Sequence, residues 1–406
     1  MIGVFFLIIL FAGLNQILFG FYYKRHSFFN KKMLNLLYLY HTLFFGVYLW
    51  YAYNNPSDSK GYYNFYTKFP GLSWFDTFGT DTSFINFLGY PFHSIGFSYE
   101  MVMVTFSWFG FVGFIYSYLF FREKIPIKVK ILKNFDLLTL LLFLPNMHFW
   151  TASLGKGAPI FMGVMMFAYS ILQPKARLFT LILSSFLVFY IRPHVFLFLA
   201  VGAVVGYISG KEKISFANKA LVVVGMLGGV LLVQDQILAV VDLEGSENLV
   251  EDFNSFTDVR SGDLSRKAGS GVDMSSYSLP FKLFTFWFRP LFVDAPNVLG
   301  LIISFENLLY LYLFLKLMRK DFYKFIKRSP SFVKMSLVIF LLTSFAMTFV
   351  MSNLGIIMRQ KQMVMYFIFF VVYYYLAEKK YLSYKKMQIM KLKNMEEKTR
   401  NEVQVL

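Results

Sequence analysis

Long apolar runs alternate with short basic connections along almost the whole chain. A helix that crosses ~30 Å of hydrocarbon needs about 20 mainly apolar residues, or somewhat fewer where polar ends reach the interface. By this measure the pattern predicts about eleven membrane-spanning helices. Their expected ranges are 3–22, 34–53, 99–121, 135–151, 158–172, 178–192, 194–210, 219–241, 298–317, 331–351 and 362–378. The spans beside Pro159 and Pro193 are short, which indicates tilted or broken helices.

Lysine and arginine gather in every second connection between these spans, for example in 24–32, 122–133 and 316–334. Basic connections of a membrane protein lie in the cytoplasm. We therefore expect the N terminus outside and the C terminus inside. The fold class predicted is an all-α polytopic integral membrane protein. It has one membrane domain over residues 1–384, followed by a basic cytoplasmic tail over residues 385–406.

Composition supports the same class. Hydrophobic residues make up 57% of the chain and charged residues 16%, whereas soluble domains carry roughly 25% charged residues. The net charge of +17 does not indicate a nucleic-acid partner, because the cations sit between apolar runs, and the expected partner is the lipid bilayer. The chain has no cysteine, which excludes disulfides, thiolate catalysis and cysteine-ligated metal.

Two longer segments, 54–98 and 242–297, fall on the expected outer face. The first is rich in aromatic residues, and it could lie on the outer leaflet or cover a cavity. The second ends in an amphipathic piece over 279–292, which indicates a surface or re-entrant helix and not a twelfth span.

Several cations lie on this outer face, against the general bias of the chain. The stretch Val188–Leu197 places Arg192 and His194 between two apolar runs, at the expected top of a helical hairpin. An ionisable group at membrane depth is a functional candidate by default, although Arg192 could instead extend to lipid headgroups. Other outer cations stand where a Gly or Pro interrupts a helix, namely Lys156, Arg289, Arg359 and Lys361. Arginine offers a planar fork of donors suited to phosphate, so these five cations predict a diphosphate-binding site.

A set of short motifs carries a resemblance to a known family. They are Asp58 with Tyr62-Tyr63-Asn64-Phe65-Tyr66, Phe149-Trp150 with Gly155-Lys156, Arg192-Pro193-His194, Asp273 with Pro280-Phe281-Lys282, Phe288-Arg289-Pro290-Leu291, Asn297, Ser304-Phe305-Glu306-Asn307 and Arg359-Gln360-Lys361. With them, most of the chain resembles bacterial polysaccharide repeat-unit polymerases of the Wzy and EpsG type. The resemblance implies a multi-pass protein of the bacterial cytoplasmic membrane that joins undecaprenyl-diphosphate-linked oligosaccharides at the outer face. It implies no cofactor and no nucleotide-sugar motif, and it leaves room for contact with other membrane proteins of polysaccharide assembly.

The resemblance also implies roles for the candidate residues. Arg192, Lys156, Arg289, Arg359 and Lys361 would stabilise the departing undecaprenyl diphosphate. A general base would take the proton of the acceptor hydroxyl, and the candidates are Asp58, Asp273, Glu306 and a neutral His194. Glu306 could instead compensate a buried charge, and Asp58 could instead cap a helix.

Three other interpretations remain open at this point. A glycosyltransferase or ligase of the GT-C type, with a polyprenyl-phosphate donor, would share the many spans, and Asp58 in the first outer segment fits its early acidic motif. A glycolipid flippase or transporter would be expected to show internal repeats and charges at mid-membrane, and the chain shows no repeat. A structural subunit of an envelope complex is the third. Metal catalysis is not expected, because the five histidines are scattered along the chain.

Overall fold

The computed structural model describes residues 1–132, 134–240, 277–295, 297–350 and 354–405. Within these ranges the protein is helical apart from one two-stranded antiparallel hairpin, in which Lys130 pairs with Asp136 and Ile131 with Phe135. The first half of the chain forms α1 (Ile2–Arg25), α2 (Lys31–Asn54), α3 (Asp58–Lys68), η1 (Phe75–Thr77), α4 (Thr82–Ser94), α5 (Tyr99–Lys124), β1 (Lys130–Ile131), β2 (Phe135–Asp136), α6 (Leu137–Leu142), α7 (Pro145–Thr151), α8 (Gly157–Ser170), α9 (Leu178–Ile191) and α10 (Pro193–Ser209). The second half forms α11 (Phe216–Leu232), α12 (Gln234–Val240), α14 (Leu279–Phe288), η2 (Phe292–Asp294), α15 (Val298–Leu315), α16 (Lys320–Arg328), α17 (Ser331–Val350), α18 (Leu354–Gln360), η3 (Lys361–Met363) and α19 (Met365–Val405).

Several helices are long and apolar enough to cross a membrane. Among the described residues five pass this test, namely α1, α2, α5, α15 and α17, and α18 with α19 would make a sixth, bent by 56°. Shorter apolar helices accompany them, over Leu137–Thr151 and in α8, α9, α10 and α11. An all-α fold with this set of helices is that of a multi-pass membrane protein.

The long helices match six of the expected spans, and the other five expected spans correspond to the shorter helices. The shorter helices end at identifiable breaks. The expected span 135–151 divides into α6 and α7 before Pro145, and α10 begins at Pro193. Proline lacks the N–H of a helix interior and is tolerated in the first turn, so each of these prolines begins a new helix.

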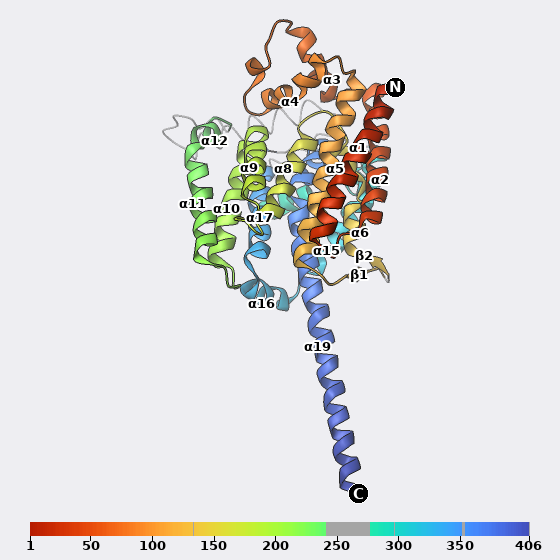
Figure 1. The fold of residues 1–406 in the computed structure, drawn as a ribbon, viewed down its shortest axis with the longest axis vertical. Coiled ribbons are helices and arrows are strands. Elements are labelled where there is room, and N and C mark those ends of the chain that lie inside the picture. Colours follow the sequence, from red (N-terminus) through yellow and green to blue (C-terminus); the bar gives the residue numbers. More distant parts are fainter. Residues whose placement is uncertain (133, 241–276, 296, 351–353, 406) are drawn as a thin grey trace.

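The bundle has two distinct ends (Figure 1). The N terminus lies at what we call the upper end, together with α3 and α4, whereas β1, β2 and α16 lie at the opposite, lower end. The last helix, α19, leaves the bundle at the lower end and continues to Val405, so the expected basic tail is helical. Its side chains from 381 to 396 are exposed.

Polar side chains begin several of the helices. The side chains of Asn30, Ser98, Asp136, Ser215 and Asn297 each accept a hydrogen bond from a backbone N–H in the first turn of α2, α5, α6, α11 and α15, respectively. Such caps satisfy N–H groups that have no partner within the helix. The helix starts are therefore fixed by local sequence, and so is the height at which each helix enters the bundle.

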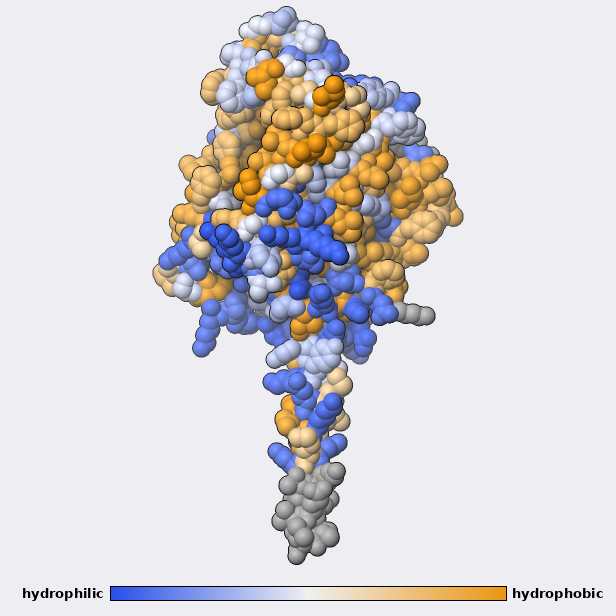
Figure 2. Space-filling model, turned by 45° about the vertical axis from the view of Figure 1, so that its right-hand side comes forward, coloured by the Kyte–Doolittle hydropathy of each residue, from blue (hydrophilic) through white to orange (hydrophobic). Residues whose placement is uncertain are grey.

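The core lies around α5, which packs most extensively against α8, while α10 packs most extensively against α17. Close approach of α10 to α17 requires glycine. A Cβ atom on Gly206 would lie 2.6 Å from the carbonyl oxygen of Ser331 and 2.7 Å from Cβ of Met335. Helices α1, α9 and α11 lie further out and expose large apolar side chains such as Phe5, Phe179 and Leu232. Figure 2 shows apolar surface over the flank of the bundle and hydrophilic surface gathered toward the lower end.

Candidate functional site

An ion pair at the upper end joins the first outer segment to the last third of the chain. Nη1 of Arg359, in α18, lies 2.7 Å from Oδ2 of Asp58, in the first turn of α3. The side chains are 36% and 69% exposed, so both charged groups are accessible from solvent. Ser57 caps α3, which places the Asp58 carboxylate beside the helix N terminus, where a negative charge is favoured. Asp58 is thus not the cap residue itself.

A second ion pair joins Lys156 to Asp81. Lys156 precedes α8, after Gly155, which has a φ of +147° and lies so close to Tyr62 that a Cβ would be 3.3 Å from its ring. Asp81 precedes α4, and its backbone N–H donates to the carbonyl of Tyr190 at 2.7 Å. Burial alone would raise the pKa of Asp81, but the hydrogen bond and charge of Lys156, aided by the charge of Arg192, outweigh burial and lower it. Asp81 therefore stays ionised at neutral pH.

Arg192 stands between α9 and α10, and His194 lies in the first turn of α10. The charges of Arg192 and Arg359 both act on the Lys156 ammonium, and those of Arg192, Asp81 and Lys156 act on the His194 ring. Five helical regions, namely the starts of α3, α4 and α8, the α9–α10 junction and α18, thus bring their polar groups into one electrostatic cluster. We call this cluster the upper polar site, and its members are Asp58, Asp81, Lys156, Arg192, His194 and Arg359.

Deeper in the bundle lies a second polar group, which we call the buried polar cluster: Asn146, Glu306, Asn307, Tyr310 and Lys361. The Lys361 side chain is fully buried, and Nζ donates to the carbonyl of Arg289 at 2.8 Å and to Oδ1 of Asn307 at 2.7 Å. Glu306 accepts a hydrogen bond of 2.5 Å from the backbone N–H of Asn146 and one of 2.8 Å from the Tyr310 hydroxyl. The amide of Asn146 donates to the carbonyl of Met358 at 3.1 Å, which ties this cluster to α18 and so to Arg359.

The deep location changes the expectation for Glu306 and Lys361. Glu306 is 5% exposed and both of its oxygens accept hydrogen bonds from the protein, so it has no access to a sugar hydroxyl. Lys361 gives two of its three donors to protein oxygens. Both residues therefore hold the fold together, because a buried charge is tolerated only with such partners.

Arg289 contacts the buried polar cluster through its backbone. Its guanidinium pairs with Asp294, which also accepts from the backbone N–H of Leu291, and its carbonyl accepts from Lys361. The Asn307 side-chain amide donates to the carbonyl of Pro290 at 2.7 Å. The segment that follows α14 is therefore held down by the buried polar cluster. The contacts of Arg289 are internal, and the described residues do not join its guanidinium to the upper polar site.

One predicted candidate remains to be accounted for, and three polar residues in or beside the two polar groups were not predicted. Asp273 lies outside the described residues. Asp81, Asn146 and Asp294 were not singled out from the sequence. Asp81 had a usable signal, since it is an acid in the turn Gly79-Thr80-Asp81-Thr82 within an otherwise aromatic segment. Asn146 had none, because it is the partner of a residue that is distant in sequence.

Two of the scattered histidines meet in the core. Nδ1 of His41 lies 2.9 Å from Nδ1 of His148, and the His148 ring stacks on Phe114 with centroids 4.0 Å apart. Each Nε2 faces a backbone carbonyl, of Ser107 for His41 and of Leu142 for His148. Over the described residues no three His, Asp or Glu side chains come together in a way that could hold a metal ion.

The upper polar site has the chemistry of an anion site that is occupied by the protein's own carboxylates. Two cations are paired with the exposed acids Asp58 and Asp81, and a third, Arg192, adds positive charge beside them. An incoming phosphate could replace either carboxylate, since phosphate and carboxylate accept the same bidentate donors. Comparison of the chain with protein-family models, with curated proteins and with solved structures found no match.

Proposed function

We propose that this protein polymerises undecaprenyl-diphosphate-linked oligosaccharide repeat units at the outer face of a bacterial cytoplasmic membrane. The observation that carries the proposal is the convergence of Lys156, Arg192 and Arg359 in the upper polar site, on three separate segments and beside two exposed carboxylates. The motif resemblance described above supplies the substrate class.

The topology proposed has eleven spans, with the N terminus outside and the C terminus in the cytoplasm. In its support, the upper end carries the N terminus and α3–α4, whereas the lower end carries α16 and the root of α19, both rich in lysine. A basic lower end corresponds to the cytoplasmic side. The upper polar site then faces the compartment in which lipid-linked repeat units would be joined.

In the proposed reaction a hydroxyl of one repeat unit attacks the anomeric carbon of a second chain. A bond forms between this carbon and the hydroxyl oxygen, and the bond to the diphosphate oxygen breaks, so that undecaprenyl diphosphate leaves with the bonding electrons. Arg359, Lys156 and Arg192 would stabilise the charge that develops on the leaving diphosphate.

Breaking one of the ion pairs would free a carboxylate to act as the general base of this reaction. When the diphosphate takes the Arg359 guanidinium, the Asp58 carboxylate loses its partner and becomes free to accept the proton of the attacking hydroxyl. Asp81 can be released from Lys156 in the same way. Of the original candidates, Asp58 is the preferred base because it is exposed and adjacent to the proposed phosphate ligand.

A second candidate is the GT-C-type transferase, and one observation favours it. Both carboxylates of the upper polar site, Asp58 and Asp81, come from the first outer segment, which is where that class carries its acidic motif. The two candidates differ in product, since a transferase adds one sugar to each unit and a polymerase sets chain length.

The test is the length distribution of surface glycan in a deletion strain complemented with wild type, Arg359→Ala, Asp58→Asn or the control Arg328→Ala. Arg328 is a matched control because it too forms an exposed ion pair, with Glu378, but at the lower end. The proposal expects long chains with wild type and Arg328→Ala. It expects glycan stalled at one repeat with Arg359→Ala and with Asp58→Asn, at protein levels equal to wild type in the membrane.

Other outcomes separate the alternatives. Loss of one sugar from every repeat would replace the polymerase with the GT-C-type transferase. Complete loss of surface glycan, with lipid-linked repeats retained inside the cell, would indicate a flippase. Unchanged chain length together with unchanged repeat composition in all strains would refute both enzyme proposals.

A further inference from the structure

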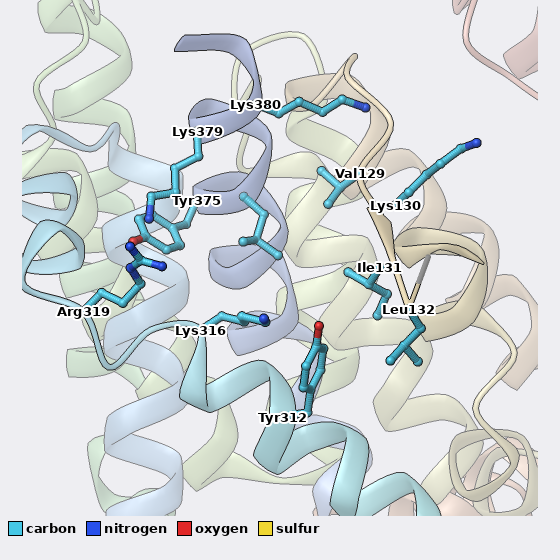
Figure 3. Close-up of a pocket in the computed structure, with 11 residues that line it drawn as sticks. Val129, Lys130, Ile131, Leu132, Tyr312, Lys316, Arg319, Tyr375, Lys379 and Lys380 are labelled. Atoms are coloured by element: carbon cyan, nitrogen blue, oxygen red, sulfur yellow. The ribbon is translucent and has the colours of Figure 1, made fainter. Parts of the chain in front are cut away.

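A pocket at the lower end has a strongly basic lining. It lies between the β1–β2 hairpin, the end of α15 and the middle of α19, and encloses about 480 Å³. Figure 3 shows Lys316 and Tyr312 projecting into the space between α19 and the hairpin, and Lys380 extending across its rim. The basic lining residues are Lys130, Lys316, Arg319, Lys379 and Lys380, and no acidic residue lines the pocket.

The carboxylates near the pocket compensate only part of this charge. Asp321 lies 2.5 Å from Lys379 and 3.5 Å from Arg319. Asp136 is turned toward the start of α6, where it accepts hydrogen bonds from the backbone N–H and the hydroxyl of Thr139. Glu378 pairs with Arg328. Among the described residues, the ion pairs of these five cations are therefore limited to those of Asp321 with Lys379 and Arg319.

Two other lining cations, Lys316 and Lys380, have uncharged partners within the protein. Nζ of Lys316 lies 4.5 Å from the ring centroid of Tyr312, and Nζ of Lys380 donates to the carbonyl of Lys128 at 2.9 Å. Lys316, Lys379 and Lys380 are half-buried, whereas Lys130 and Arg319 are exposed. Like charges gathered around one pocket repel one another, and a bound anion would relieve the repulsion. Phosphate suits the site, because lysine and arginine are its usual ligands.

An apolar path leads away from the pocket along α15. Phe305, Leu308, Tyr312 and Leu315 follow one another at spacings of three and four residues, so they share one face of the helix. Phe305, Leu308 and Leu315 are 67%, 49% and 55% exposed, respectively, and Tyr312 lines the pocket itself. A ligand with its charge in the pocket could thus lay a hydrocarbon chain along the membrane-facing side of the same helix.

We propose that this pocket binds the phosphate of an anionic membrane lipid in the leaflet at the lower end, with an acyl chain along Leu308 and Phe305. Basic pockets between membrane helices are known to take anionic headgroups. The lipid is favoured over a soluble phosphate because only a lipid uses both the cations and the apolar stripe. The proposal is independent of the activity proposed for the upper polar site.

The test is native mass spectrometry of the full-length protein, purified in detergent and titrated with phosphatidylglycerol, phosphatidylcholine or glycerol phosphate. Wild type is expected to retain one phosphatidylglycerol at least tenfold more tightly than phosphatidylcholine. The variant Lys130→Gln/Lys316→Gln is expected to lose this preference, and Lys316→Arg to keep it, which separates loss of charge from a failure to fold. The control Lys385→Gln/Lys386→Gln removes two exposed lysines of α19 beyond the pocket and should bind like wild type.

Three outcomes would overturn the proposal. Equal retention of phosphatidylglycerol by wild type and the Lys130→Gln/Lys316→Gln variant would show that the lipid sits elsewhere. Equal retention of phosphatidylcholine, which carries the same phosphate beside a cationic choline, would show that the net negative charge of the headgroup is not recognised. Displacement of phosphatidylglycerol by glycerol phosphate at the same concentration would assign the pocket to a soluble phosphate compound.

Discussion

Replacement of Lys361 by methionine tests whether the buried polar cluster holds the upper part of the bundle together. Methionine is similar in length but has no ammonium, so the Arg289 carbonyl and Oδ1 of Asn307 both lose a buried donor. The charge of Glu306, which acts on Lys361, loses its compensation as well. The segment after α14 and η3 would then lose their shared contact.

The size of the effect follows from these contacts. An acceptor left unsatisfied in the interior costs about 1–3 kcal/mol, and two are left here. Removal of one partner from a buried charge arrangement costs about 3–5 kcal/mol as a whole. We take about 4 kcal/mol for Lys361→Met, which lowers the melting midpoint by about 5–10 °C.

Arg359→Met is a matched control, because Arg359 stands only two positions before Lys361 and loses the same charge. Its ion pair with Asp58 is exposed, and exposed pairs contribute about 0–1 kcal/mol. The midpoint of Arg359→Met should therefore stay within about 2 °C of wild type. Its glycan chain length should nevertheless collapse, because the proposed phosphate ligand is gone.

The assay is thermal unfolding of the purified protein in lipid nanodiscs, followed by intrinsic fluorescence. The double variant Lys361→Met/Asn307→Leu should not recover the lost stability, because loss of the Asn307 amide leaves the buried Pro290 carbonyl without its donor. Equal midpoints for Lys361→Met, Arg359→Met and wild type would refute the structural role of the buried ammonium.

Three further predictions concern other parts of the chain. Asp81 has a φ of +61°, which glycine adopts at little cost, so Asp81→Ala should be less stable than Asp81→Gly by about 1 kcal/mol in nanodisc melting. The hydrogen bond from Lys379 lowers the pKa of Asp321 to about 2 from an ordinary value of 3.8. The ion pair of Asp321 therefore stabilises the fold fully above about pH 4, and this stabilisation is lost as the pH falls toward 2. The difference in melting midpoint between wild type and Asp321→Asn should shrink over that interval. A constant difference would contradict the pairing. Gly206→Ala should lower the free energy of unfolding by about 1–3 kcal/mol, because the added carbon overpacks against Ser331. Gly225→Ala, with no heavy atom within 4 Å of the added carbon, should be neutral or stabilising. Equal melting midpoints for the two variants would refute the close approach of α10 to α17.

The apolar pattern predicted most of the helices, since the hydrophobic runs and their Pro and Gly breaks are local features. The hairpin turn at Arg192 is an example, because Pro193 can only begin the next helix. Sequence could not predict which helices would be long enough to cross a bilayer alone. The expected span 135–151 divides at Pro145, and its second half is buried against several other helices.

The pairing of the polar residues was less accessible to sequence reasoning, because each partner lies far along the chain. Asp58 meets Arg359 and Asn146 meets Glu306 only through the packing of α3, α7, α15 and α18. A local pattern contains no information on such contacts. The charge distribution predicted Asp58 and Arg359 on the same side of the bundle, but it did not predict their contact.

One difference between two candidates could have been anticipated from the sequence. Arg359 and Lys361 were both expected to contact the diphosphate, yet residues two apart on a helical segment point in nearly opposite directions, about 200° apart at 100° per residue. In the structure Arg359 reaches the exposed Asp58, and Lys361 is enclosed among Asn307 and Tyr310. One short segment thus places one cation in the upper polar site and uses another to hold itself against the core. This division of roles explains why two neighbouring cations should respond so differently to the same substitution.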